Sequence, residues 1–338
     1  MRVLIIGGAG FIGSNYAARR LAAGDEVVVF DNLSRPKTEL NLEWLRSRHG
    51  SKLAFITGDV RDYQAVAQAT AGAGAVAHLA GQVAVTTSVV NPREDFEINA
   101  LGTFNVLDAV RRGCPEAAVL FASTNKVYGG LEDAYVVEQP TRYALPDLPN
   151  GVPETQPLDF HSPYGCSKGA ADQYVRDYAR VYGMRTVVFR QSCIYGTRQF
   201  GVEDQGWVAH FCISAALGRP ITIYGDGKQV RDVLWIDDLL NAYDLGLEHI
   251  DVAAGKIYNV GGGPANTMSI WAEFKPLLQR LMSSTVDVNY RDARVGDQKV
   301  YVSNIDKASR EIGWAPRVSV QEGVERLWRW VNDNRDLF

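Results

Sequence analysis

With 338 residues, the chain is long enough to bury a large core as one large domain or two coupled ones. Lys and Arg number 35 against 39 for Asp and Glu, so the formal charge of -4 excludes the strongly basic surface that nucleic acids or acidic membranes attract. The four cysteines show no CxxC spacing and the five histidines form no ligand-spaced cluster with them, so we expect neither a disulfide framework nor a metal site.

The first residues, MRVLIIGGAGFIG, contain an apolar run that is interrupted by glycines after four positions. Such a run is too short for the core of a signal peptide, and no later stretch stays apolar for long enough to span a bilayer. We therefore expect a cytoplasmic protein with reduced thiols and no membrane partner.

Short apolar runs alternate with helical periodicity up to about residue 190. The runs are VLIIG, EVVVFD, LAFITGD, AVAHLAG, AVLFAS and RTVVFR. Strands that alternate with helices predict right-handed crossovers and a parallel sheet covered on both faces. The expected fold class is α/β, a doubly wound parallel sheet of the Rossmann type, with a smaller lobe interleaved toward the C-terminus.

Beyond residue 190 the regularity breaks, although VLWIDDLLNAYDLGLEHI and GKIYNVGGG read as a helix and a strand that return to the large sheet. We predict a dinucleotide-binding domain at 1–190 with a return segment at about 232–260. The substrate-binding lobe would comprise 191–231 and 261–338. The stretch 131–161 has no clear period, and connections of that length are usually functional or disordered.

Gly7, Gly10 and Gly13 follow the first run and open a helix, and Asp31 ends the second run at nearly the ~20-residue interval of dinucleotide-binding units. The glycines let the backbone approach a pyrophosphate at the helix N-terminus. Asp31 would accept hydrogen bonds from the adenosine ribose and repel a 2′-phosphate, which favours NAD over NADP. The residues predicted to hold NAD are Gly7, Gly10, Phe11, Ile12, Gly13, Asp31, Asn32, Ser34, Arg35, Asp59, Val60, Leu79, Ala80, Gly81, Gln82, Asn99, Tyr164 and Lys168.

Thr124 ends the fifth run on the same rim as the glycine loop, and Tyr164 and Lys168 stand four apart on the next helix, hence on one face of it. A strand-end hydroxyl, this Tyr and Lys, and the glycine loop together resemble the extended short-chain dehydrogenase/reductase family. The resemblance implies tightly bound NAD+ and Tyr164 as a proton acceptor. Lys168 and the positively charged nicotinamide would both move the phenol's pKa down from about 10 toward the working range.

Asn125 and Lys126 stand where sugar-nucleotide dehydratases of this family usually carry an Asp-Glu pair. An amide and an ammonium cannot act as the acid and base for water elimination, so dehydration is not expected. Lys126 would either contact the substrate or form an ion pair within its loop.

Longer strings look like the CDP-tyvelose 2-epimerase subfamily, also called CDP-paratose 2-epimerases, from the first strand to about Pro316. They are NLSRP, GQVAVTTS, STNKVYGG, TRY, LDFHSPYGCSKGAADQY, YGTRQFG, DQGWV and GKQVRDVL. The resemblance implies inversion at C2 of a CDP-linked sugar through a 2-keto intermediate. FRQSCIYG departs from the subfamily's usual His-Ser-Ser-Met-Tyr-Gly run at Gln191, Cys193 and Ile194. This segment is expected to line the sugar pocket, so CDP-glucose and CDP-mannose become candidate substrates in addition to CDP-paratose and CDP-tyvelose.

The resemblance implies a set of substrate contacts, with Arg231 and Arg294 on the pyrophosphate, Asp297 on the nucleotide ribose, and Gln199 and Phe200 at the base. The full set is Val83, Thr124, Asn125, Lys126, Gln191, Ser192, Cys193, Gln199, Phe200, Arg231, Arg294 and Asp297. Two alternatives stay open, a UDP-glucose 4-epimerase-type enzyme and a noncatalytic NAD-binding regulator. A third possibility, a one-way reductase, would require exchange of free NAD(H) and stoichiometric turnover of the cofactor.

A homodimer or homotetramer is expected, because family members commonly pair through helices that would here be 92–112 and 163–182. Phe96, Leu101, Val175 and Tyr178 lie on these helices, either on an outer apolar face or in the core.

Overall fold

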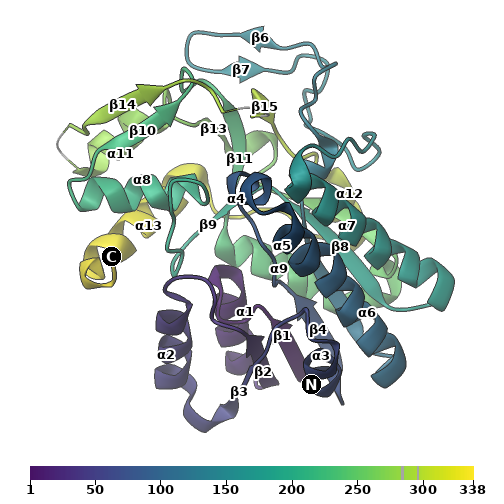
Figure 1. Cartoon of the computed structure of the whole chain (residues 1–338). Coiled ribbons are helices and arrows are strands. Elements are labelled where there is room, and N and C mark those ends of the chain that lie inside the picture. Colours follow the sequence, from purple (N-terminus) through teal and green to yellow (C-terminus); the bar gives the residue numbers. More distant parts are fainter. Residues whose placement is uncertain (283–284, 295–296) are drawn as a thin grey trace.

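The first strand, β1 (Arg2–Ile6), contributes apolar side chains to both faces of a central sheet. Val3 and Ile5 belong to the core on one face, and Leu4 and Ile6 to the core on the other. Because successive side chains of a strand point to opposite faces, such a strand has to be covered on both. The computed structural model, which describes residues 1–282, 285–294 and 297–338, shows helices on both faces of this sheet (Figure 1).

The strands of the central sheet all pair in parallel, in the order β3-β2-β1-β4-β5-β8-β12. After β1 their bounds are β2 (Glu26–Asp31), β3 (Leu53–Thr57), β4 (Ala75–His78), β5 (Ala118–Thr124), β8 (Thr186–Gln191) and β12 (Lys256–Val260). The direction of winding reverses between β1 and β4, so ligands are expected at the carboxyl ends of these strands. The predicted doubly wound parallel sheet is confirmed.

Two groups of helices cover the sheet. On the face of Leu4 and Ile6 lie α3 (Tyr63–Thr70), α6 (Gly102–Gly113) and α7 (Ser162–Tyr182). On the face of Val3 and Ile5 lie α1 (Phe11–Ala22), α2 (Thr38–His49), α9 (Ile236–Glu248), α10 (Ile250–Ala253) and α12 (Asp306–Ile312).

A π-helical turn, Glu97–Leu101, joins α5 (Pro92–Phe96) to α6. It buries Asn99, whose side chain exchanges hydrogen bonds of 3.0 Å with the backbone N–H and C=O of Gln82. The turn therefore fixes the loop between β4 and α4 (Val85–Val90), at the switch point of the sheet. Periodicity alone does not reveal such a turn, because it interrupts an otherwise regular helix.

Above the carboxyl ends of the central strands lies a smaller set of elements (Figure 1). β11 (Val230–Trp235) pairs there with β9 (Cys193–Tyr195), β13 (Thr267–Ser269) and β15 (Val300–Tyr301), and β10 (Ile221–Tyr224) pairs with β14 (Val288–Arg291). Its helices are α8 (Trp207–Ala216), α11 (Phe274–Met282) and α13 (Val320–Asp333). The chain passes from β11 through α9 to β12, which pairs with β8 in the central sheet. The functional division of the chain at these boundaries stays a prediction.

The stretch 131–161 contains a short hairpin, β6 (Val137–Glu138) and β7 (Tyr143–Ala144). Leu131, Leu145 and Val152 pack with Val230 and Tyr301 in an apolar cluster of their own. This packing ties the segment to the smaller set of elements beside the site described next.

Candidate active site

A cavity of about 420 Å³ lies between the carboxyl ends of the central strands and the smaller set of elements. Residues from β5, α7 and the glycine loop line it, together with residues from β9, β11 and the segment before α8. The predicted site residues that line it are Phe11, Ile12, Leu79, Gly81, Val83, Thr124, Asn125, Lys126, Tyr164, Lys168, Gln191, Ser192, Cys193, Gln199, Arg231, Arg294 and Asp297.

Tyr164 and Lys168 lie in the first turns of α7, so both face the cavity. The N–H of Tyr164 donates to Ser88 Oγ at 3.1 Å, which ties the helix start to α4. Lys168 Nζ donates to the carbonyl of Ala122 at 2.7 Å and lies 4.3 Å from the centre of the Phe121 ring. β5 therefore holds the lysine beside Thr124, its last residue.

Burial controls the ionisation of both side chains. Burial raises the pKa of Tyr164 to about 12, against a smaller lowering by the Thr124 hydroxyl. Burial also lowers the pKa of Lys168 to about 8, against the carboxylates of Asp172 and Asp95. In the chain by itself desolvation therefore dominates, and the carboxylate of Asp95 raises the pKa of the phenol further. The lowering expected beside a bound, positively charged nicotinamide stays a prediction.

The glycine loop packs closely against β4 and stays open on its outer side. A Cβ at Gly7, whose φ is +81°, would lie 2.5 Å from the N of Ala80, and one at Gly13 would lie 2.2 Å from the Gly7 carbonyl. A Cβ at Gly10 would meet only the Gly7 carbonyl, at 3.2 Å. The backbone at Gly10 can therefore be approached by a ligand at the N-terminus of α1.

Replacing Gly7 with alanine is expected to destabilise the protein by about 2–3 kcal/mol, because a positive φ and a backbone clash act together. Gly24→Ala is the matched control, since Gly24 has a φ of +90° and no atom within 4 Å of the added Cβ. That variant should lose only about 1 kcal/mol. Urea unfolding of both variants measures the difference, and equal losses would contradict the clash.

Asp31, at the end of β2, holds the glycine loop. Its carboxylate accepts from Ala9 N at 3.0 Å and Leu33 N at 2.8 Å, and burial raises its pKa despite these bonds. Asn32 Nδ2 donates to Asp59 Oδ2 at 2.9 Å, which connects the ends of β2 and β3. These carboxylates lie along the rim on which the adenosine half of a dinucleotide is predicted.

The remaining predicted NAD residues lie around that rim. Val60 is buried and Ala80 packs against Gly7, while Gln82 and Asn99 bind one another. Ser34 N donates to Asn32 Oδ1 at 3.1 Å. Arg35 donates to Gln205 Oε1 at 2.5 Å, so the loop after β2 contacts the segment before α8.

Two arginines and a further lysine, Arg231, Arg294 and Lys126, also line the cavity. Arg231, which is buried, donates to Asp297 Oδ1 at 2.6 Å. Arg294 lies 3.0 Å from Asp204 Oδ1 and stacks 4.0 Å from the centre of the Tyr224 ring. Lys126 Nζ donates to Gln298 Oε1 at 3.3 Å.

Side chains of the segment FRQSCIYG line the cavity and form hydrogen bonds with residues of other elements. Gln191 Nε2 donates to the Tyr243 hydroxyl, and Ser192 Oγ donates to Asp232, a buried carboxylate that also accepts from Ser303 N at 3.1 Å. Burial raises the pKa of the Cys193 thiol, which therefore stays neutral at pH 7. The three side chains shape the wall without offering a charge.

The two residues predicted to contact the nucleotide base lie in different surroundings. Gln199 is buried and lines the cavity, with Nε2 donating to the Ile194 carbonyl at 3.2 Å. Phe200 packs instead against Trp330 and Phe338, with ring centroids 6.5 and 5.7 Å apart, and is not among the residues lining the cavity.

Sequence reasoning missed the aromatic part of the wall, which consists of Trp207, Phe211 and Tyr224. Trp207 and Phe211 lie one helical turn apart on α8, and that spacing was the available signal. An aromatic wall beside the arginines suits the stacking of a flat ring.

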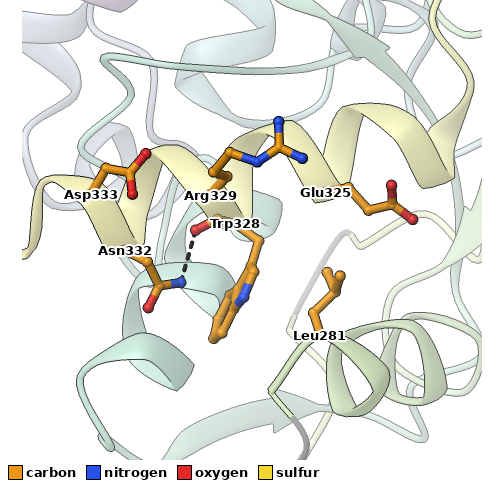
Figure 2. A pocket seen from close by; sticks show the side chains of 6 residues that line it. All are labelled: Leu281, Glu325, Trp328, Arg329, Asn332 and Asp333. Carbon is orange, nitrogen blue, oxygen red and sulfur yellow. Dashed lines mark hydrogen bonds between the residues drawn. The ribbon is translucent and has the colours of Figure 1, made fainter.

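A second hollow, of about 340 Å³, lies between α11 and α13 (Figure 2). Figure 2 shows the ring of Trp328 extending from α13 and Arg329 leaving the same helix in a different direction; both line the hollow together with Leu281 of α11. Asn332 Nδ2 donates to the Trp328 carbonyl at 2.8 Å. Glu325, Arg329 and Asp333 of α13 also line the hollow, and the hydrogen bond between Asn332 and Trp328 lies within that helix.

Among the described residues, no helix is long and apolar enough to cross a membrane. The same part of the chain brings together no group of three or more His, Cys, Asp or Glu side chains that could hold a metal ion.

Comparisons with known proteins agree with this geometry. The family model described as GDP-mannose 4,6 dehydratase matches residues 4–327. The chain is 45% identical over 98% of its length to a CDP-paratose 2-epimerase of Salmonella typhi, covering 99% of that protein. Among solved structures, a UDP-glucose 4-epimerase of Thermotoga maritima with UDP-glucose has a TM-score of 0.84 at 29% identity, covering 99% of this chain and 100% of that one. A dTDP-glucose 4,6-dehydratase of Streptomyces venezuelae with NAD bound also has a TM-score of 0.84, at 30% identity, covering 100% of this chain and 99% of that one.

Proposed function

Because the chain belongs to the GDP-mannose 4,6 dehydratase family, we propose that it is an NAD-dependent epimerase that inverts C2 of a CDP-linked hexose. The observation that carries the proposal is that Thr124, Tyr164 and Lys168 line the same cavity as the two arginines, Arg231 and Arg294. The 45% identity to a CDP-paratose 2-epimerase supports the choice of carbon and nucleotide.

The chain's residues fit a dinucleotide. The open backbone at Gly10 and the carboxylate of Asp31, at the end of the neighbouring strand, would hold its pyrophosphate and adenosine ribose. Lys168 and Tyr164 would lie beside its nicotinamide half. When bound, NAD+ supplies reversible hydride acceptance, so that a sugar carbon can be oxidised and reduced again without an external oxidant.

Tyr164 is the proton acceptor for the sugar hydroxyl in this proposal. Lys168, with a pKa of about 8, remains largely protonated at pH 7, and a cation beside the phenol favours the phenolate. Thr124 would hold the same hydroxyl toward Tyr164. After the keto sugar has turned, C2 would regain its hydride on the opposite face, and Tyr164 would return the proton to the oxygen, which completes the inversion.

Epimerisation is favoured over dehydration by the residues that follow Thr124. Asn125 and Lys126 both line the cavity, so the positions where a dehydratase would need carboxylates are occupied by an amide and an ammonium.

The sugar is proposed to be a paratose/tyvelose pair or a glucose/mannose pair. Gln191 and Ser192 are held by Tyr243 and Asp232, so the wall at FRQSCIYG is fixed and apolar at Cys193 and Ile194. A wall of this kind tolerates a deoxy position better than it binds a hydroxyl.

We propose a homodimer formed through α5, α6 and α7. Phe96, Leu101 and Phe104 are exposed there beside Tyr174 and Tyr182, whereas Val175 and Tyr178, predicted at either an outer face or the core, are buried. Light scattering of the purified protein would distinguish a dimer from a tetramer or a monomer.

A UDP-glucose 4-epimerase is the second candidate, because the TM-score of 0.84 to such an enzyme shows that the same architecture can present C4 instead. A noncatalytic regulator is disfavoured, since Tyr164 and Lys168 are both retained at the cavity.

Proton NMR of the protein purified without added cofactor tests the proposal. Incubation with CDP-paratose, CDP-glucose and UDP-glucose in separate tubes should show inversion at C2 of a CDP-sugar. The ranking of the two CDP-sugars identifies the sugar. Inversion only at C4 of UDP-glucose would replace the proposed function with the second candidate.

A further inference from the structure

Lys126 is a charged residue of the cavity to which the proposed chemistry gives no task. It follows Thr124 by two positions in a short 3₁₀ turn, Asn125–Tyr128, whose start is held because Lys126 N donates to Thr124 Oγ1 at 3.2 Å. Its ammonium donates to Gln298 Oε1 at 3.3 Å. The side chain therefore extends from the reacting end of the cavity toward the arginines.

Among the described residues, no carboxylate forms an ion pair with the ammonium of Lys126. Arg231 and Asp297 face it, and these two already form an ion pair at 2.6 Å. Cys193 also faces it and is neutral at pH 7. Arg231 and Lys126 thus present two cations to one carboxylate, which is an arrangement suited to a bound anion.

Sugar chemistry indicates which anion reaches this place. In a nucleotide sugar the β-phosphate is linked through oxygen to C1, and C2 is bonded directly to C1. When C2 lies at Tyr164, the β-phosphate must lie close to the reacting end. When C4 lies at Tyr164 instead, the sugar ring stands between the reacting carbon and the β-phosphate.

We infer that Lys126 binds the β-phosphate of the substrate and thereby holds C2, rather than C4, at Tyr164. This inference rests on the proposed function and specifies how the site selects its carbon. A carboxylate at position 126 would repel the same phosphate, so the lysine is also what separates this site from one built for dehydration.

Binding of CDP and of CMP to the holoenzyme tests the contact, because only CDP has a β-phosphate. Lys126→Met keeps most of the side-chain volume and removes the charge. We expect calorimetry to show about tenfold or greater loss of CDP affinity, the range for a hydrogen bond to a charged group, and a change in CMP affinity of less than about twofold. The control Lys299→Met removes an exposed lysine, which stacks 5.1 Å from the Tyr143 ring, and should change neither affinity.

The pH dependence gives a readout that a merely structural role would not change. Burial lowers the pKa of Lys126 to about 8, with Arg231 acting in the same direction and Asp297 and Cys193 against it. CDP binds the protonated form, and its own phosphate titrates near pH 6. CDP affinity should therefore be level from about pH 7 to 8 and fall above pH 8, by at most about tenfold per pH unit. Lys168 titrates in the wild-type protein and in Lys126→Met alike. A fall in CDP affinity that the wild-type protein shows and the variant does not is therefore due to Lys126.

Three results would overturn the inference. They are unchanged CDP affinity in Lys126→Met, an equal loss for CDP and CMP, and identical pH profiles for the two proteins. The proposed function fails separately, because wild-type protein that binds CDP through Lys126 and inverts no CDP-sugar contradicts the epimerase while the phosphate contact remains.

Discussion

The Tyr164→Phe variant is expected to epimerise its CDP-sugar about 10³-fold or more slowly than the wild-type protein. Phenylalanine keeps the ring, which is buried at the start of α7, and removes only the hydroxyl that we propose as the acceptor of the substrate's proton. Neither Thr124 nor Lys168 can replace it, because the hydroxyl of Thr124 is far less acidic than a phenol and Lys168 Nζ is engaged by the Ala122 carbonyl at 2.7 Å.

The measurement is the initial rate of C2 inversion by NMR, together with the NAD content of the purified variant. NAD content and melting temperature should stay close to the wild-type values. Tyr135→Phe is the control, since Tyr135 is exposed in the segment 131–161, outside the helices of the proposed dimer, and should be replaceable without loss. Full activity of Tyr164→Phe would remove this residue from the mechanism.

Arg190→Met is expected to lower the free energy of unfolding by about 3–5 kcal/mol, because it leaves the Asp172 carboxylate buried without its cation. Arg190 and Asp172 are 2% and 0% exposed, and two hydrogen bonds of 2.9 Å join them. Asp172 lies on α7 one turn beyond Lys168 and also accepts from Ser123 Oγ at 2.7 Å. The pair therefore fixes the helix that carries the site to β5 and β8.

Chemical denaturation measures this loss. Arg326→Met is the matched control, because it breaks an exposed ion pair with Glu322 on α13 and should cost no more than about 1 kcal/mol. A loss in Arg190→Met as small as in the control would show that the carboxylate finds other partners or water.

The central sheet and the core of the site were predictable because their signals are local. We could read three such signals directly from the sequence: the alternation of strands and helices, three glycines after a strand, and Tyr164 four residues before Lys168. Their assembly at one rim follows from the parallel topology, in which all strands end at the same edge.

The parts that sequence reasoning missed depend on tertiary packing. Phe200 follows Gln199 directly, yet its ring turns toward Trp330 and Phe338, residues far along the chain. Sequence reasoning also missed that burial raises the pKa of Tyr164 in the chain without a cofactor, because burial depends on what the whole fold places around the phenol. Neither effect leaves a periodic trace in the sequence.

The path of the chain back to β12 limits how this protein can acquire new substrates. A fragment ending at residue 190 would lack the strand that covers β8, and would expose a long apolar edge that invites aggregation. The part that would contact the sugar is therefore not a separate domain that could be replaced as a whole, because its chain returns to the central sheet through β12. New specificity is then expected to arise by point substitutions in the cavity wall. Cys193 and Ile194 are suited to this, because both line the cavity and belong to β9, which pairs with β11 outside the central sheet.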